Sequence, residues 1–321
     1  MKSLIACALG AVLLAASGGA SAQAPGYPTK PVNLVVPYAP GGITDGAARV
    51  IAQKLGEKWK QPVLVINRAG GGTVIGTKEV SAAGPDGHTL LLTSFGYVMN
   101  QVLHKALPYE PKSLAALNMV GLAPNVLYLH PSVPASNVPE LVAYAKANPG
   151  ALKFASSGNA SSPHIAAELF GAITGTNVVH VPYRGTGPAM QDVLGGQVSG
   201  IFDTMQSLPY VKTGKLKVIA VAHGDRLPGA PDVPTFKEAG LPGMVTSSWF
   251  GFFASALTPE PLRRRMFDDI QDVLKQPDLR AKLVQLGVEP TLWTQSEFQR
   301  FLDNEVERWT ALTKTRNINL D

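Results

Sequence analysis

The chain has 321 residues, of which 45% are hydrophobic and 16% charged, and its formal net charge is +5 at pH 7. This length exceeds what one hydrophobic core usually holds, so we expect two lobes. The modest net charge does not indicate a nucleic-acid partner. The densest cationic run, Arg263–Arg265, does not indicate one either, because it shares a helical pattern with the apolar residues Met266, Ile270 and Val273. Such spacing is typical of a solvated helix face.

The first residues have the pattern of a secretory signal peptide. Lys2 precedes an apolar run over residues 4–16, and small residues follow up to Ala-Ser-Ala at positions 20–22. The run is too short to span a bilayer, so we expect cleavage after Ala22 and a periplasmic protein of residues 23–321. Cys7 mimics a lipoprotein signal but leaves no room for an apolar segment before it. As the only cysteine, it would leave the mature protein without disulfides or thiolate sites.

Apolar strands and amphipathic helices alternate along the first part of the chain. We predict strands over 32–36, 62–66 and 88–94, helices over 46–58 and 74–82, and a glycine loop over 69–72. The first strand runs through "PYAPGGITD" into its helix, and a glycine pair between strand and helix is typical of an anion held on backbone N–H groups. The alternation favours mostly parallel sheets covered on both faces.

A second set of elements begins near Asn125. We predict strands over 125–130, 152–158, 177–183, 198–203 and 215–223, and helices over 138–147, 165–173 and 188–194. An apolar strand over 249–255 and two or three helices follow, the last opened by a capping box at Thr294–Glu297. We therefore expect lobe 1 to comprise residues 23–123 and 246–321, and lobe 2 residues 124–245, with chain crossings near 122–125 and 246–249. Ligands of such sheets bind beyond the carboxyl ends of the strands.

Enzyme motifs are weak in this sequence. Gly70, Gly72 and Gly76 resemble a dinucleotide loop, but the next strand ends in Thr-Ser-Phe without the expected acid, and no P-loop occurs. No G-x-S-x-G elbow surrounds the candidate serines, and the histidines lack metal-ligand spacing. A hydrolase that pairs Ser157 or Ser162 with His164 remains an alternative, and hydroxyls that only donate hydrogen bonds are the favoured interpretation.

The tips of the strand-to-helix loops are rich in glycine, serine, threonine and asparagine. Neutral donors and helix N-termini of this kind are typical of a site for a small polar anion, and the paired carboxylates that bond-breaking needs are missing. Several candidates also have purely structural explanations: a turn at Gly41-Gly42, a helix cap at Asp45 or His164, surface exposure of Arg184, core packing of Trp249 and Phe250, and loop anchoring by Asp203.

The segments "YPTKPVNLVVPYAPGGITDGAARVIAQKL", "VINRAGGGTVIGT", "FASSGNASSPHIAAELF", "VHVPYRGTGPAMQDVLGGQV" and "SSWFGFFAS" together resemble the solute receptors of tripartite tricarboxylate transporters, also called Bug-type periplasmic binding proteins. The similarity covers the mature chain. It implies a type II-like two-lobe α/β fold, each lobe a mixed sheet flanked by helices, that closes on its ligand. It also implies a monomeric receptor without enzymatic activity, cofactor or metal, which delivers a small carboxylate to the permease subunits of a transporter.

The resemblance assigns ligand contacts to loops of both lobes. Carried over to this sequence, they are Tyr38, Pro40, Gly41, Gly42, Thr44, Asp45, Ser94, Phe95, Ser156, Ser157, Asn159, Ser162, His164, Arg184 and Asp203. Ile43, where relatives commonly have a small hydroxyl residue, and Pro163 depart from the family pattern. The family takes aliphatic, amino-acid and aromatic carboxylates. Ile43, Phe95 and Tyr97 favour a partly apolar ligand here, and ligand sensing for a signalling partner is a further alternative.

Overall fold

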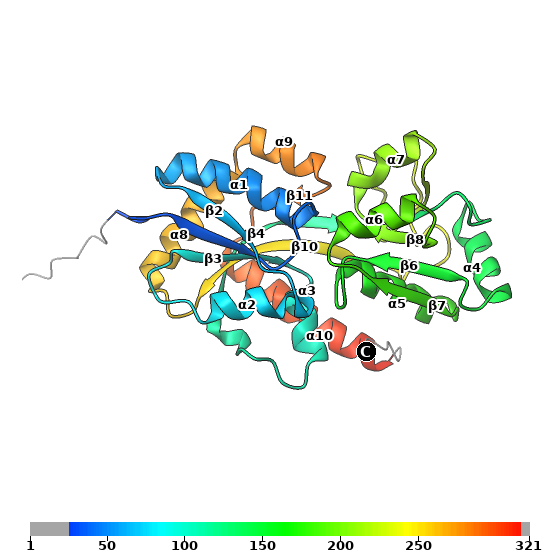
Figure 1. The fold of residues 1–321 in the computed structure, drawn as a ribbon, viewed down its shortest axis with the longest axis horizontal. Helices are drawn as coiled ribbons and strands as arrows, with labels where there is room; N and C mark the ends of the chain where they lie inside the picture. Colours follow the sequence, from blue (N-terminus) through cyan, green and yellow to red (C-terminus); the bar gives the residue numbers. More distant parts are fainter. Residues whose placement is uncertain (1–25, 316–321) are drawn as a thin grey trace, which may run out of the picture.

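The computed structural model describes residues 26–315, so the predicted signal peptide, its cleavage after Ala22 and Cys7 lie outside the described residues. Figure 1 shows two bodies side by side, each built on one sheet with helices on its faces. This arrangement confirms the predicted two-lobe α/β fold. No helix within residues 26–315 is long and apolar enough to cross a membrane.

Lobe 1 is the body built on a six-stranded sheet, with the order β11-β4-β10-β3-β1-β2 among the described residues. Its strands are β1 (Val32–Val36), β2 (Val63–Asn67), β3 (Thr89–Ser94), β4 (Leu114–Pro124), β10 (Ser247–Ser255) and β11 (Glu289–Pro290). Strands β2, β1 and β3 are parallel, and β10, β4 and β11 are each antiparallel to their neighbours. Its helices are α1 (Ile43–Trp59), α2 (Val74–Ser81), α3 (Gly96–Leu103), α8 (Glu260–Leu274), α9 (Pro277–Gln285) and α10 (Gln295–Thr315).

Lobe 2 is the body built on a five-stranded sheet, with the order β7-β6-β8-β5-β9 among the described residues. Its strands are β5 (Val126–Leu129), β6 (Leu152–Ser156), β7 (Val178–Pro182), β8 (Gly200–Asp203) and β9 (Lys217–Val221). Its helices are α4 (Val138–Ala147), α5 (Ser162–Thr174), α6 (Thr186–Leu194) and the short α7 (Leu208–Lys212). Strands β7, β6 and β8 are parallel, and β5 is antiparallel to both β8 and β9.

The two sheets share one topology. Three parallel strands, β2-β1-β3 or β7-β6-β8, are followed by an antiparallel strand that has just crossed from the other lobe, β10 or β5. The crossing strand places the two sheets end to end, as the course of β10 through the middle of Figure 1 shows. The carboxyl ends of the parallel strands in both lobes therefore meet the same interlobe space.

The two crossings are hydrogen-bonded to each other. Asn125, the residue between β4 and β5, donates its N–H to Thr246 O at 3.0 Å and accepts from Ala222 N at 2.7 Å. Thr246 N in turn donates to Ala222 O at 2.9 Å. The lobe boundaries at residues 123/124 and 245/246 remain a prediction, which the sheet membership of these strands supports.

Helix spacing explains which faces are buried in lobe 1. Helix α1 buries Ala47, Ile51 and Leu55, one residue per turn, against the sheet. Helix α8 buries Met266 and Ile270, whereas Arg264 on its other side is 64% exposed. The arginine run is thus a solvated helix face, as predicted.

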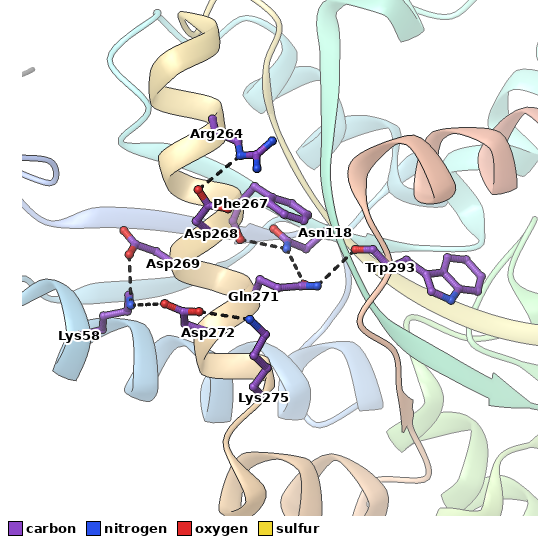
Figure 2. Close-up of polar contacts among 10 residues, drawn as sticks. All are labelled: Lys58, Asn118, Arg264, Phe267, Asp268, Asp269, Gln271, Asp272, Lys275 and Trp293. Atoms are coloured by element: carbon purple, nitrogen blue, oxygen red, sulfur yellow. Dashed lines mark hydrogen bonds and ion pairs between the residues drawn. The ribbon is translucent and has the colours of Figure 1, made fainter.

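Polar contacts tie α8 to its neighbours (Figure 2). Lys58 at the end of α1 lies 3.3 Å from Asp269 and 3.0 Å from Asp272 on α8. The buried Asn118 of β4 donates to the Phe267 carbonyl at 3.2 Å, which closes the inner side of the same helix. These contacts hold α8 against α1 and against β4 of the sheet.

The structure differs from the predicted elements mainly at helix starts. Helix α1 begins at Ile43 and α5 at Ser162, three residues before each prediction, and Pro163 fits the first turn of α5 because its missing N–H needs no partner there. Helix α3 and strand β4 were not predicted. The capping box is confirmed, since Thr294 N donates to Glu297 Oε2 and Glu297 N to Thr294 Oγ1.

Candidate functional site

A small cavity of about 40 Å³, here called the inner cavity, lies between the lobes. Lobe 1 contributes loops after β1 and β3 and residues of β10; lobe 2 contributes loops after β6, β7 and β8; and Asn125 comes from the crossing. The lining residues are Tyr38, Ala39, Gly42, Ile43, Thr44, Ser94, Phe95, Asn125, Ser157, Ser161, Ser162, Pro163, Gly185, Thr186, Asp203, Thr204, Ser248 and Phe250.

A larger cavity of about 790 Å³, here called the outer cavity, adjoins the inner one. The two spaces share part of their walls, formed by Tyr38, Ala39, Ser157, Ser161 and Gly185. The outer cavity is further bounded by the glycine loop after β2, the residues around His104, and the Asn159 and Arg184 loops of lobe 2.

The lobes approach each other closely around these cavities. A methyl group on Gly185 would lie 3.4 Å from Ala39 Cβ, and one on Gly287 would lie 2.7 Å from Thr204 Oγ1. Ala39 and Gly287 belong to lobe 1, whereas Gly185 and Thr204 belong to lobe 2. Small residues at these positions therefore permit the closed arrangement of the lobes.

Helix N-termini from both lobes converge on the inner cavity. The N-cap residues of α1, α3, α5 and α6 are Gly42, Phe95, Ser161 and Gly185, and all of them line it. Within the described residues, none of these four N-cap residues uses its side chain to accept a hydrogen bond from an N–H group in the first turn of its helix. The N–H groups of a first turn have no intrahelical partner and carry partial positive charge, so the cavity favours an anion.

The side chains around the inner cavity are mostly neutral hydrogen-bonding groups. Burial raises the pKa of Tyr38 to about 12, so its hydroxyl keeps its proton at neutral pH. Thr44 and Ser94 add hydroxyls from lobe 1, and Ser157 adds one from lobe 2. Arg184 is exposed at the outer cavity and forms no ion pair with any residue in the described range.

Asp203 is the acidic residue of the inner lining. It ends β8, is 3% exposed, and accepts hydrogen bonds from Ser207 Oγ at 2.5 Å and Gln206 Nε2 at 3.3 Å. Burial raises the pKa of its carboxyl group even though these donors act in the opposite direction. These bonds anchor the loop that follows β8 within lobe 2, rather than the interlobe loops of the predicted alternative, and Asp203 also lines the inner cavity.

Two buried polar groups at the inner cavity have no hydrogen-bond partner among the described residues: Asn125 Nδ2 and Thr204 Oγ1. Ser162 Oγ donates to Asn125 Oδ1 at 2.5 Å, which orients the amide group. Residues Asn125 and Thr204 face each other across the β5–β8 ladder, because the next pair along it is Val126 and Asp203. Unpaired buried polar groups are costly and call for a partner.

The predicted site residues divide into three groups. Tyr38, Gly42, Thr44, Ser94, Phe95, Ser157, Ser162 and Asp203 line the inner cavity. Asn159 and Arg184 line the outer cavity only. Pro40, Gly41, Asp45, Ser156 and His164 line neither.

The side chain of Asp45 makes its contacts within lobe 1 rather than at the cavity. It is 5% exposed and accepts from Gly41 N at 3.0 Å, from Arg49 at 2.9 Å and from Asn67 at 3.0 Å. Although burial opposes the effect, these hydrogen bonds lower the pKa of Asp45. Asp45 thus fixes the shape of the first loop. It lies within α1 and does not cap it, because the N-cap residue is Gly42 and the loop N–H that Asp45 accepts from belongs to Gly41.

His164 stacks on His180, with ring centroids 3.6 Å apart. His164 Nδ1 accepts from Ala160 N at 3.1 Å, so the ring holds the loop ahead of its own helix. A serine–histidine contact near this stack joins Ser156 Oγ to His180 Nε2 at 2.6 Å, and within residues 26–315 neither Ser157 nor Ser162 is hydrogen-bonded to His164. Ser156 is fully buried and lines neither cavity, which leaves this pair without access to a substrate.

Sequence reasoning missed several lining residues. Asn125 precedes a strand without any motif, and Ser248 lies on β10, whose position depends on the return of the chain to lobe 1. Phe250 both packs in the core and lines the inner cavity, whereas Trp249 is core, as predicted. No cluster of three or more histidine, cysteine, aspartate or glutamate residues suited to a metal occurs within residues 26–315.

Comparisons with known proteins agree with this geometry. Residues 47–318 match the model of the tripartite tricarboxylate transporter family receptors. Protein BugT of Bordetella pertussis is 34% identical over 316 residues, which cover 97% of each chain. The structure of the periplasmic binding protein BugD is 32% identical, with a TM-score of 0.86 over 91% of this chain and 99% of that one. R. palustris Rpa4515, solved with adipate, is also 32% identical, with a TM-score of 0.87 and the same coverage. The chain therefore belongs to the tripartite tricarboxylate transporter receptor family, a family of solute-binding receptors rather than enzymes.

Proposed function

We propose that this receptor captures a small carboxylate in the inner cavity and delivers it, in the periplasm, to the permease subunits of a tripartite tricarboxylate-type transporter. One observation carries the proposal: the N-termini of four helices meet at one interlobe cavity. In the described part of the chain, no N-cap side chain occupies the first-turn N–H groups of these helices. Each helix N-terminus stabilises an adjacent negative charge by roughly 0.3–1 kcal/mol, and up to about 2 kcal/mol when partly buried.

The same geometry supports holding a ligand rather than transforming it. Tyr38 stays protonated and acts as a donor. Burial lowers the pKa of His180 to about 4, and its serine partner has no access to either cavity. Backbone N–H groups and hydroxyls give a carboxylate its hydrogen bonds without activating a nucleophile.

Part of the inner wall is apolar, which bears on the class of carboxylate. Ile43 and Phe95 from lobe 1 lie beside the N-termini of α1 and α3, and Phe250 adds a ring from β10. Adipate, the acid bound to the related Rpa4515, has an apolar chain between its carboxylates. We therefore favour a carboxylate with an apolar part. The outer cavity has the volume for the rest of such a molecule, and Arg184 at its edge attracts anions at longer range.

The direct contacts proposed for the carboxylate are the first-turn N–H groups of α1 and α5 and the hydroxyls of Tyr38, Thr44 and Ser157. Closing of the lobes around the crossings at Asn125 and Thr246 completes this set, because the contacts come from both lobes. Asp45, Ser156 and His164 act by shaping the loops.

Thermal-shift screening of the mature protein against aliphatic, amino-acid and aromatic carboxylates tests the proposal. A bound acid stabilises the protein by RT ln(1 + [L]/Kd), which is about 2.7 kcal/mol at a hundredfold excess over Kd. We expect at least one carboxylate to raise Tm while its amide or methyl ester does not. A panel in which no carboxylate raises Tm, or ester turnover that Ser157→Ala abolishes, would contradict it.

A further inference from the structure

A polar subsite lies at the inner end of the cavity, where β5 begins and β8 ends. Asn125, Asp203 and Thr204 all line the cavity there and are at most 3% exposed. They are neighbours through the β5–β8 ladder, in which Val126 pairs with Asp203. The subsite therefore sits next to the crossing between the lobes.

The hydrogen-bonding capacity of these residues is only partly used inside the protein. Asn125 Oδ1 accepts from Ser162, so the amide offers its Nδ2 as a free donor. Thr204 Oγ1 has no partner in the described residues. Asp203 Oδ1 accepts one long bond, at 3.3 Å from Gln206, and so retains acceptor capacity.

We infer that this subsite reads a hydrogen-bond donor, a hydroxyl or an ammonium group, carried next to the carboxylate of the ligand. Asn125 Nδ2 donates to a carboxylate oxygen, while Asp203 and Thr204 accept from the neighbouring substituent. The inference rests on the proposed function, because it assumes that a carboxylate occupies the inner cavity.

The electrostatics of the subsite support a donor rather than a second anionic group. No lysine, arginine or histidine among the described residues contributes to the pKa of Asp203, which burial raises. The titratable neighbour from β5 is Tyr128, whose phenol donates to the Thr204 carbonyl at 2.9 Å. Burial is the main cause that raises the pKa of Tyr128, and the nearby Asp203 adds to the shift. A hydroxyl or ammonium group offers the Asp203 carboxyl group a hydrogen-bond donor, which a second carboxylate lacks.

Matched acids that differ only at the 2-position test the inference by titration calorimetry. The sets are succinate, malate and aspartate; glutarate, 2-hydroxyglutarate and glutamate; and phenylacetate, mandelate and phenylglycine. Within the carbon skeleton that binds, we expect a substituted acid to bind about tenfold or more tightly than the unsubstituted one, as one charge-assisted hydrogen bond implies. The hydroxy and amino members show which donor the subsite takes.

Variants assign the effect to the subsite. Thr204→Val removes an unpaired hydroxyl without breaking a bond and should reduce the preference for the substituted acid over the unsubstituted one, both measured in the same variant. Asp203→Asn should abolish a preference for an amino acid and weaken one for a hydroxy acid. Asn125→Asp should weaken all acids, and Asn148→Asp, at an exposed helix end outside both cavities, is its matched control.

Three outcomes overturn the inference while the proposed function stands: equal binding within a matched set, an unchanged preference in Asp203→Asn and Thr204→Val, or tighter binding of unsubstituted acids by Asp203→Asn. The last result would show that Asp203 repels the ligand. Failure of all acids to bind the wild-type protein would overturn the proposed function and this inference with it. Circular dichroism of each variant verifies that the fold is intact.

Discussion

Ser162 Oγ donates a 2.5 Å hydrogen bond to Asn125 Oδ1, and this bond joins the first turn of α5 to the crossing between the lobes. Both residues are at most 2% exposed and both line the inner cavity. A displacement of the first turn of α5 at the inner cavity would thus act directly on the crossing about which the lobes would move.

Replacing Ser162 with alanine should lower the free energy of unfolding by about 1–3 kcal/mol, because Asn125 Oδ1 would lose its partner while staying buried. Urea denaturation measures the change. Ser81→Ala is the matched control, since Ser81 donates only to the Lys78 carbonyl at an exposed helix end, and its cost should stay within about 0.5 kcal/mol. Equal effects of the two substitutions would contradict a special role of the Ser162–Asn125 bond.

Closure should depend on Gly287, which approaches Thr204 from the opposite lobe. Gly287→Ala adds a methyl group 2.7 Å from Thr204 Oγ1 and strains a residue at φ +78°, so ligand affinity and stability should both fall. Gly240→Ala is the control, because Gly240 has φ +87° but no neighbour within 4 Å. Both should lose about 1 kcal/mol of stability from the backbone.

Small-angle scattering distinguishes the two glycine variants. The wild-type protein and Gly240→Ala should become more compact at saturating ligand, and Gly287→Ala should change less. Identical profiles of the wild-type protein with and without ligand would count against hinge closure altogether.

The stacked histidines should make the protein less stable in acid. Burial lowers the pKa of His164 to about 3, with His180 adding to the shift, and burial lowers that of His180 to about 4. Unfolded imidazoles protonate near pH 6.5, so the unfolded chain binds more protons between about pH 6.5 and 4. The free energy of unfolding should therefore fall as the pH falls through this window.

Urea denaturation at several pH values measures that dependence. His180→Phe keeps a ring against His164 and should give a shallower fall than the wild-type protein. A slope unaltered by His180→Phe would show that other groups cause the acid sensitivity.

Arg184 should contribute little to binding at equilibrium. Its side chain is exposed at the outer cavity and has no ion-pair partner within residues 26–315, so Arg184→Gln should cost about 1 kcal/mol or less. The loss should come from slower association and shrink as salt is added. Stopped-flow binding measures it, with Lys237→Gln as the control for removing a charge elsewhere on lobe 2. A salt-independent loss of several kcal/mol would instead place Arg184 against the ligand.

Local patterns predicted the strand-to-helix units well because each unit carries its own signals. A buried strand, a glycine or serine loop and an amphipathic helix follow one another at β1–α1 and β6–α5, and these loops do line the inner cavity. The position of Asp45 could also have been inferred, since Arg49 lies four residues further along the same helix face.

The remaining features depend on contacts between distant segments. Strand β4 has no loop motif and is defined by its pairing with β10. The paired residues Pro124 of β4 and Ser247 of β10 are more than 120 residues apart in the sequence. His180 lies on a strand next to that of Ser156, so neither the stack on His164 nor the bond to Ser156 has a local signal. Asn125 becomes a cavity residue only because β8 ends beside it.

Titration calorimetry of Gly42→Val with the carboxylate found by screening tests the central claim most directly. Gly42 has φ −88° and ψ 175°, a conformation open to valine, and a methyl group there would lie 3.9 Å from Thr186 Oγ1 across the cavity. The substitution removes no hydrogen-bond donor but fills the space in front of the α1 N-terminus. Affinity should fall about tenfold or more, a loss of at least about 1.4 kcal/mol. Gly84→Val, with no neighbour within 4 Å, should bind like the wild type. Wild-type affinity in a correctly folded Gly42→Val protein would contradict the placement of the carboxylate at this helix.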